Sequence, residues 1–455
     1  MKEIPINKKY LFACVVLALM LCLAQVTGYT MPIMACLGMY MILIAWCCCF
    51  NFTLPILLFF LPWSPLLKMD PAGYSFYTFA MVFICFISII KRQFNFRNYQ
   101  LKAGILVLLV TLFSKVLDGN GITFDYMAFV MMIFLFPSVK EEWREQKYDF
   151  YQVVTFFALG VVIAAMCALG FAQTPGIRRF IRVDAYLTII RRSGFYGDAN
   201  FYTAQILAAM GGVLSLFLQE KKKGRLLFMA VIVAFLLYCG LLSGSKSFVL
   251  VFTVLLVLWV IAIMRMRGKA GLKATLLIFL ILGLVYIATS ALFGGLITVI
   301  ATRFSFAKNL NSFTTGRIGL WKSYSNEIFS NFKTFFLGQG FTNIKVNGRA
   351  SHNTIIQMLF QFGVIGTAVL IYWIACFFRE RKRTLKKREN YGLKSLIVAV
   401  GSFLPWIAID ALFFDEFFLL QWYMLVALNY FRPDEKAVNI EPVHKEENYG
   451  RENEE

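Results

Sequence analysis

The chain has 455 residues, of which 59% are hydrophobic and only 15% are charged, and its mean hydropathy is +0.69. A soluble globular domain carries about 25% charged residues, so this composition excludes an ordinary soluble protein and favours a chain that lies largely in lipid, where charge is costly. The formal net charge of +20 must then lie on the connections between apolar segments, which favours anionic partners: membrane lipids, phosphates or diphosphates. No nucleic acid partner is expected, because the basic residues are scattered rather than gathered in one domain.

Apolar segments of about 20 residues span a bilayer as helices, and about fourteen such segments follow one another along the sequence. The third is short and contains Pro55 and Pro62, which favours a broken or re-entrant segment. We therefore expect an all-α integral membrane protein with 12 to 14 transmembrane helices, formed by residues 1–431 as a single transmembrane domain, followed by a charged, disordered cytoplasmic tail at 432–455. The predicted spans are residues 10–27, 31–50, 52–67, 74–90, 103–117, 121–138, 151–171, 201–218, 226–242, 248–264, 272–293, 354–378, 395–411 and 414–431.

Connections rich in Lys and Arg face the cytoplasm. With the N-terminus inside, the connections that face the cytoplasm are 91–102, 140–149, 220–225, 265–273 and 379–394, and all but 140–149 are rich in Lys and Arg. The charged tail falls on the same side, so we expect both termini in the cytoplasm.

Two connections on the outer side depart from this rule. Residues 172–198 hold five arginines against two aspartates, and residues 294–352 hold seven basic residues against one glutamate. Loops of this length tolerate basic charge. An anion site at the outer membrane surface would also retain these residues, because forked Arg donors suit phosphate oxygens.

A series of short motifs follows in a fixed order in the second half of the chain, most of them in these outer loops. They are Arg192-Ser193-Gly194, Asp198-Ala199-Asn200, Ser243-Gly244-Ser245-Lys246-Ser247, Thr315-Gly316-Arg317, Trp321, Leu337-Gly338-Gln339-Gly340, Ser351-His352-Asn353, Gly363 and Gly366. In order, spacing and outside placement they resemble the O-antigen polymerase and O-antigen ligase superfamily. Lys246 stands where that family usually has an arginine, which keeps the charge but removes the fork.

The resemblance implies transfer of a polyprenyl-diphosphate-linked glycan to a glycan or lipid hydroxyl acceptor. It also implies an extracytoplasmic active site in a bacterial inner (plasma) membrane, without nucleotide sugar, metal or other cofactor. The residues agree with this expectation, since Asp-x-Asp occurs nowhere in the chain and its two histidines offer no metal cluster. The ten cysteines lie mostly within apolar segments, and we interpret them as small buried hydrophobic residues.

The chemistry implied by the resemblance assigns two roles to the outer loops. Arg191, Arg192, Lys246 and Arg317 would hold the diphosphate, and Arg317 would also stabilise its departure as a catalytic residue. His352, the one histidine outside the tail, would be the general base. The alternatives are a helix-start role for His352 and a lipid-phosphate contact for Arg317.

Three further residues are candidates for contact with the glycan: Asn353, Trp321 and Asp415. An interfacial anchor is an equal interpretation for Trp321. Asp415 belongs to a cluster with Asp410 and Glu416 that could orient a basic residue, bind acceptor sugar or solvate a helix end. The Gly338 and Gly340 pair favours a tight turn over a phosphate cradle.

Several functions are consistent with this sequence. A polymerase is favoured over a ligase because the chain has an additional N-terminal set of helices and nothing that points to a protein acceptor. The shape-and-division glycosyltransferases are a more distant resemblance. A flippase or transporter of lipid-linked glycans is the alternative of a different class, but it would be expected to show internal repeats and midplane charges, and no repeat is found.

Overall fold

The computed structural model describes residues 7–90, 99–117, 123–135, 148–181, 184–186, 189–266, 309–341, 344–385 and 389–431, with residues 268, 283, 304 and 305. These residues are almost entirely helical. One hairpin interrupts the pattern, where β1 (Asp184–Tyr186) pairs antiparallel with β2 (Ile189–Arg191). The hairpin lies within the predicted outer loop 172–198, for which no strands are predicted.

Seven helices are long and apolar enough to cross a membrane. They are α1 (Lys8–Thr27), α2 (Thr30–Cys49), α8 (Phe150–Gly170), α10 (Ala199–Phe217), α11 (Lys223–Leu242), the helix Lys246–Met266, and Thr354–Cys376 within α17 (Thr354–Leu385). The other helices of eight residues or more are α3 (Thr53–Phe60), α4 (Phe76–Ile90), α5 (Tyr99–Leu117), α6 (Phe124–Leu135), α15 (Arg317–Phe329), α18 (Glu389–Phe403) and α19 (Glu416–Tyr430). The short elements are η1 (Leu61–Trp63), α9 (Pro175–Arg178), η3 (Gly194–Tyr196), α14 (Leu310–Phe313), α16 (Phe332–Leu337), η4 (Leu404–Ala408) and η5 (Ala411–Phe413).

The predicted spans therefore divide into three groups. Seven coincide with the helices that are long and apolar enough to cross a membrane, and six coincide with α3, α4, α5, α6, α18 and α19. The span at 272–293 lies outside the described residues, as do the connection 140–147 and the tail 432–455. The third span is broken, as its prolines predict, because α3 continues only into the 3-10 turn η1. The chain is thus a membrane-embedded helical protein, and the count of fourteen crossings stays a prediction.

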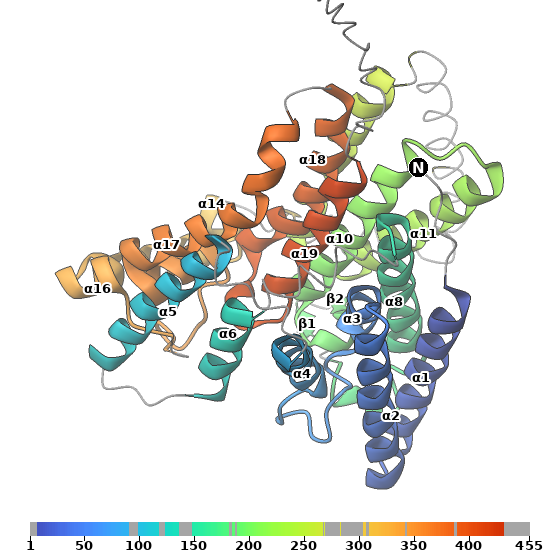
Figure 1. Cartoon of the computed structure of the whole chain (residues 1–455), viewed down its shortest axis with the longest axis horizontal. Coiled ribbons are helices and arrows are strands. Elements are labelled where there is room, and N and C mark those ends of the chain that lie inside the picture. Colours follow the sequence, from blue (N-terminus) through green and yellow to red (C-terminus); the bar gives the residue numbers. More distant parts are fainter. Residues whose placement is uncertain are drawn as a thin grey trace, which may run out of the picture.

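The centre of the molecule is built from α8, α10, α18 and α19, which lie together in Figure 1. All of α10 except Asn200 is buried, and α19 is buried as far as Leu428. A helix that is apolar on every side is buried within a larger assembly of helices. Small residues allow α10 and α18 to cross closely, since a Cβ on Gly401 would lie 2.5 Å from the Leu207 carbonyl oxygen.

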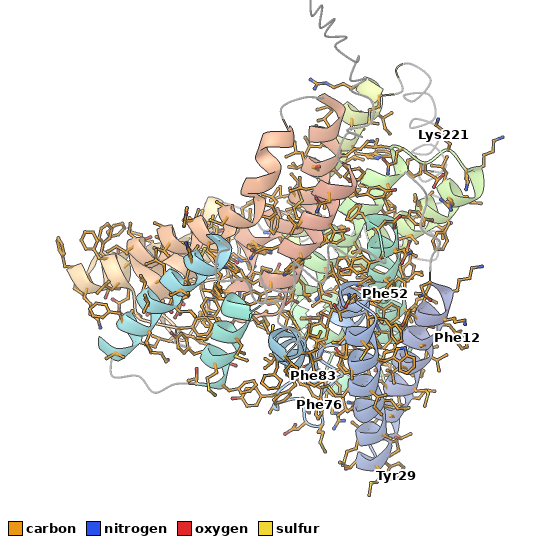
Figure 2. All side chains as sticks on the ribbon, in the orientation of Figure 1. Phe12, Tyr29, Phe52, Phe76, Phe83 and Lys221 are labelled. Atoms are coloured by element: carbon orange, nitrogen blue, oxygen red, sulfur yellow. The ribbon has the colours of Figure 1, made fainter. Side chains whose placement is uncertain are left out.

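The pair α1 and α2 lies at the periphery and exposes apolar side chains. Phe12 is 70% exposed and Met31 is 79% exposed, and Figure 2 shows Phe12 on the outer side of this pair while Phe52 lies inside. Large apolar surfaces of this kind need a covering, which lipid supplies in a membrane-embedded protein. Tyr29 and Lys221 lie at opposite ends of the molecule (Figure 2), so the two connections that carry them are at opposite ends as well.

On the side away from α1 and α2, the helices α5, α16 and α17 lie side by side (Figure 1). α17 is broken at Gly363, whose φ of 61° belongs to the left-handed region. Gly338, at φ 75°, packs against this break, since a Cβ there would lie 2.5 Å from the backbone of Gln361. Gly338 therefore allows its loop to approach the backbone of α17 closely, and this contact holds the first turns of that helix. From α5, Lys115 Nζ donates to the Phe341 carbonyl at 3.2 Å and anchors the same loop.

Candidate functional site

The Ser351-His352-Asn353 motif forms a turn at the start of α17. His352 has φ 50°, a conformation that is uncommon for a residue with a side chain. The Asn353 side chain accepts from the backbone N–H groups of Ile355 at 3.0 Å and Ile356 at 3.2 Å. Asn353 is thus the N-cap of α17 and fixes where the helix begins.

Asp410 holds this turn from the other side. Its carboxylate accepts hydrogen bonds from the Ser351 hydroxyl and, at 2.8 Å, from the backbone N–H of His352. The His352 imidazole Nδ1 lies 3.8 Å from Asp410 Oδ2, which is an ion-pair distance when the ring is protonated. The carboxylate therefore fixes the backbone of His352 and can stabilise a positive charge on its ring.

The position of Asp410 depends in turn on the first turn of α17. The Thr354 hydroxyl donates to the Ile409 carbonyl at 2.8 Å and accepts from the Ala411 N–H at 3.0 Å. One side chain thus satisfies both backbone groups that flank the aspartate. The segment between η4 and η5 is tied to α17 in this way, although the two are far apart in the sequence.

His352 and Asp410 line a pocket of about 380 Å³, which is within the usual range for small-molecule sites. The pocket is formed where α6, α10, α15, α17 and the segment after η4 meet. Its polar residues include Asp125, Ser351, Lys345, Gln357 and Gln361. Its aromatic residues are Phe201, Tyr324, Phe360, Phe413 and Phe414. The walls thus combine ring faces with hydrogen-bonding groups.

The helix α15 connects Arg317 with this pocket. Trp321 Nε1 donates to the Ser351 carbonyl at 3.0 Å, and Tyr324 Oη donates to the Arg349 carbonyl at 2.8 Å. Burial raises the pKa of the Tyr324 phenol, so it stays protonated and remains a donor. Arg317, Trp321 and Tyr324 follow one another at a spacing of four and three residues, which places them on one face of the helix. Arg317 is therefore at the beginning of the face that reaches the pocket.

The other basic candidates lie beside the segment that precedes α15. Lys246 Nζ donates to the carbonyl oxygens of Phe313 at 2.9 Å and Ser312 at 3.4 Å. The backbone N–H of Arg192 donates to the carbonyl of Leu242 at 3.3 Å, just ahead of the Ser-rich turn. Arg192, Lys246 and Arg317 are named here the basic group. Hydrogen bonds to Leu242, Ser312 and Phe313 connect the three segments that carry them.

Asn200 joins the basic group to the pocket. Its side-chain oxygen accepts from the hydroxyls of Ser245 at 3.0 Å and Ser247 at 3.2 Å, on either side of Lys246. Its neighbour Phe201 lines the pocket. Two motifs that are separate in the sequence therefore meet at the start of α10, next to the His352 pocket.

The predicted residues fall into distinct positions. His352 lines the pocket, and the side chains of Trp321 and Asn353 hold the turn beside it. The basic group lies outside the pocket lining, and so does Asp415, which accepts from the Thr78 hydroxyl at 3.0 Å. Arg191 ends β2, and its side chain is outside the described part of the structure.

Of the residues that line the pocket, only His352 was predicted from the sequence as a site residue. Three of the polar residues that were missed matter most for its chemistry. They are Asp125, Lys345 and Gln357. Asp410 was noted only as part of an acidic cluster, and its contact with His352 spans 58 residues of sequence. The available signal was the placement of Asp410 just after a Pro-containing turn, Leu404–Ala408, where a helix would otherwise continue.

No protein-family model matches this chain, and no curated protein matches it. Among the described residues there is no group of three or more His, Cys, Asp or Glu side chains placed to hold a metal ion. The fold and the site together define a helical membrane protein. Its site is a His-Asp pair in a pocket lined by aromatic and polar residues, and the basic group lies outside that lining.

Proposed function

We propose that this protein is a metal-independent membrane glycosyltransferase that moves a polyprenyl-diphosphate-linked glycan to a hydroxyl acceptor. In this proposal it polymerises repeat units of a surface polysaccharide, such as O-antigen, capsule or exopolysaccharide. The observation that carries the proposal is the His352–Asp410 pair in the wall of a pocket, with the basic group beside it. The proposal includes about fourteen crossings of a bacterial inner membrane, with both termini in the cytoplasm and residues 172–198 and 294–352 outside.

His352 would act as the general base. It takes the proton of the acceptor hydroxyl while the acceptor oxygen forms a bond to the anomeric carbon of the donor. The bond from that carbon to the diphosphate oxygen breaks, its electron pair leaves with the diphosphate, and the anomeric centre is inverted. Asp410 stabilises the imidazolium that forms, and it already holds the His352 backbone.

The basic group would receive the leaving diphosphate. Fixed positive charges stabilise an anion that develops in the transition state. The planar fork of an arginine guanidinium matches phosphate oxygens more closely than the single ammonium group of a lysine, and Lys246 Nζ already binds the segment before α15 through two carbonyls. We therefore assign Arg317 the main role in diphosphate stabilisation, with Arg192 as its partner and Lys246 holding the segment in place.

The test is synthesis of polymer by the purified full-length protein in liposomes supplied with lipid-linked repeat units. His352→Ala is expected to lower the rate by about 10²- to 10⁴-fold, the usual contribution of a general base, without loss of the folded protein. Arg317→Ala should slow transfer as well, whereas Lys221→Ala, which removes an exposed charge elsewhere, should not. Full activity of the His352 variant would overturn the assignment of the base.

Analysis of glycan chain length in a strain that lacks the protein separates the related functions. Accumulation of single repeat units on lipid would establish a polymerase. Long polymer that stays on lipid would identify a ligase instead. Unchanged glycan would refute both.

A further inference from the structure

Gln357 lines the pocket, and only the oxygen of its side-chain amide has a hydrogen-bond partner. The side chain is 3% exposed, and its Oε1 accepts from the backbone N–H of Leu412 at 3.2 Å. Because a backbone N–H is a donor, it must face the amide oxygen, and this fixes the orientation of the group. The amide nitrogen Nε2 then has no hydrogen-bond partner among the described residues.

An amide donor left unpaired in the interior is costly. Among the pocket-lining residues that the structure describes, Gln357 Nε2 is the one buried side-chain nitrogen or oxygen atom without a hydrogen-bond partner. In the wall of a pocket, this cost is removed when a ligand supplies an acceptor oxygen. The arrangement resembles a site prepared for a ligand more than a defect of packing, because Leu412 holds Gln357 in its orientation.

The charges and rings of the pocket restrict the ligand. Two carboxylates, Asp125 and Asp410, stand against one ammonium group, Lys345, so a diphosphate or a uronic acid would meet like charge. Hydroxyl groups, by contrast, can donate to carboxylates and accept from an amide. The rings of Phe360 and Phe413 offer apolar surface. An uncharged pyranose matches this combination, since it carries hydroxyl groups at its edge and C–H groups on its faces.

We infer that the pocket is a binding subsite for an uncharged pyranose of the acceptor glycan, and that Gln357 Nε2 donates to an oxygen of that sugar. The identification of the sugar as the acceptor's rests on the proposed function, because His352 lies in the same wall. The diphosphate of the donor is then bound by the basic group, outside the pocket lining. Gln357 is in this way a specificity-determining residue.

Two substitutions separate recognition of the sugar from support of the fold. Gln357→Glu keeps an oxygen for the Leu412 N–H and removes the Nε2 donor, whereas Gln357→Met removes both. Gln219→Glu is the matched control, because Gln219 Oε1 accepts from Lys394 Nζ, a contact outside the pocket. The melting temperature of each full-length variant reports whether the fold is intact.

Binding is measured by saturation-transfer NMR on the full-length protein in nanodiscs, without turnover. The probes are the methyl glycosides of glucose and N-acetylglucosamine, methyl glucuronide and inorganic pyrophosphate. We expect one or both uncharged glycosides to bind, and binding to weaken about 5- to 150-fold in both Gln357 variants, as for loss of a specific hydrogen bond of about 1–3 kcal/mol. The Gln219 control should bind as the unmodified protein does.

Three results would overturn the inference. The first is unchanged glycoside binding in Gln357→Glu, which would limit Gln357 to holding Leu412. The second is binding of neither uncharged glycoside. The third is pyrophosphate that displaces the glycoside and depends on Gln357, which would make the pocket an anion site. Glycoside binding that needs Gln357, in a protein that transfers no glycan, would keep the subsite and refute only the proposed enzyme.

Discussion

Replacement of Asp410 by Asn tests the His352–Asp410 pair most directly. The asparagine keeps the shape of the carboxylate and one acceptor oxygen, which can face the His352 N–H. Its amide can face the Ser351 hydroxyl, which is able to turn and accept. The geometry of the turn is thus preserved, while the negative charge 3.8 Å from the imidazole is lost.

The size of the effect follows from that distance. Two unit charges about 4 Å apart attract by about 4 kcal/mol at an effective dielectric constant near 20. The imidazole is 36% exposed, so solvent screens the pair, and exposed ion pairs contribute about 1 kcal/mol or less. A value between these limits, about 2 kcal/mol, corresponds to about a 30-fold loss in the rate of transfer.

The assay is the initial rate of polymer synthesis in liposomes at saturating lipid-linked donor. Ser351→Ala is the matched control, because it removes one hydrogen bond to the same carboxylate but keeps the charge. Because the negative charge beside the imidazole remains, Ser351→Ala should slow transfer less than Asp410→Asn does, although the hydrogen bond that it removes is to a charged group. The electrostatic argument is wrong if the initial rate of Asp410→Asn lies within a factor of about two of the rate of the unmodified protein and the two melt at the same temperature.

Three further predictions concern the elements around the pocket. Asn353→Ala should destabilise the protein by about 0.5–2 kcal/mol, because the N-cap of α17 is lost. Asn353→Asp should melt at the temperature of the unmodified protein. An alanine variant that is inactive but fully stable would instead indicate contact with glycan. Gly363→Ala should lower the yield of folded protein, because a Cβ there meets the backbone of Phe336, whereas Gly224→Ala, with open space around it, should fold normally in the same size-exclusion assay. Trp321→Phe should lower the melting temperature by the equivalent of about 1 kcal/mol and leave transfer within about tenfold; a larger loss of transfer at unchanged stability would favour stacking on sugar.

The helices could be predicted from the sequence because apolar length is a local property. α1, α2 and α8 begin and end within a few residues of the predicted spans. The helix α17 starts at the predicted Thr354, but its break at Gly363 was not predicted, because the break depends on the contact with Gly338 in another segment. The β1–β2 hairpin was missed as well, since a single pair of three-residue strands leaves little pattern in the sequence.

In the site, too, features that are local in the sequence could be predicted and contacts between distant residues could not. His352 was predicted from its motif and its surroundings in the sequence, and it lies in the pocket. Asp410 and Gln357 could not be assigned, because their roles depend on contacts that connect α17 with the segment after η4. A pattern along the chain does not show such contacts between distant residues, and only the folded chain brings them together.

The break in α17 also bears on where polar side chains lie along this helix. Gln357 and Gln361 lie within the apolar window Thr354–Cys376, at a depth where a continuous helix would carry its side chains among lipid tails. Amide groups in hydrocarbon cost several kcal/mol each, and irregular backbone at that depth is tolerated where it lines a cavity. Both glutamines are buried beside the pocket instead. One glycine thus separates the first turns of α17, whose glutamines line the pocket, from the apolar remainder of the helix.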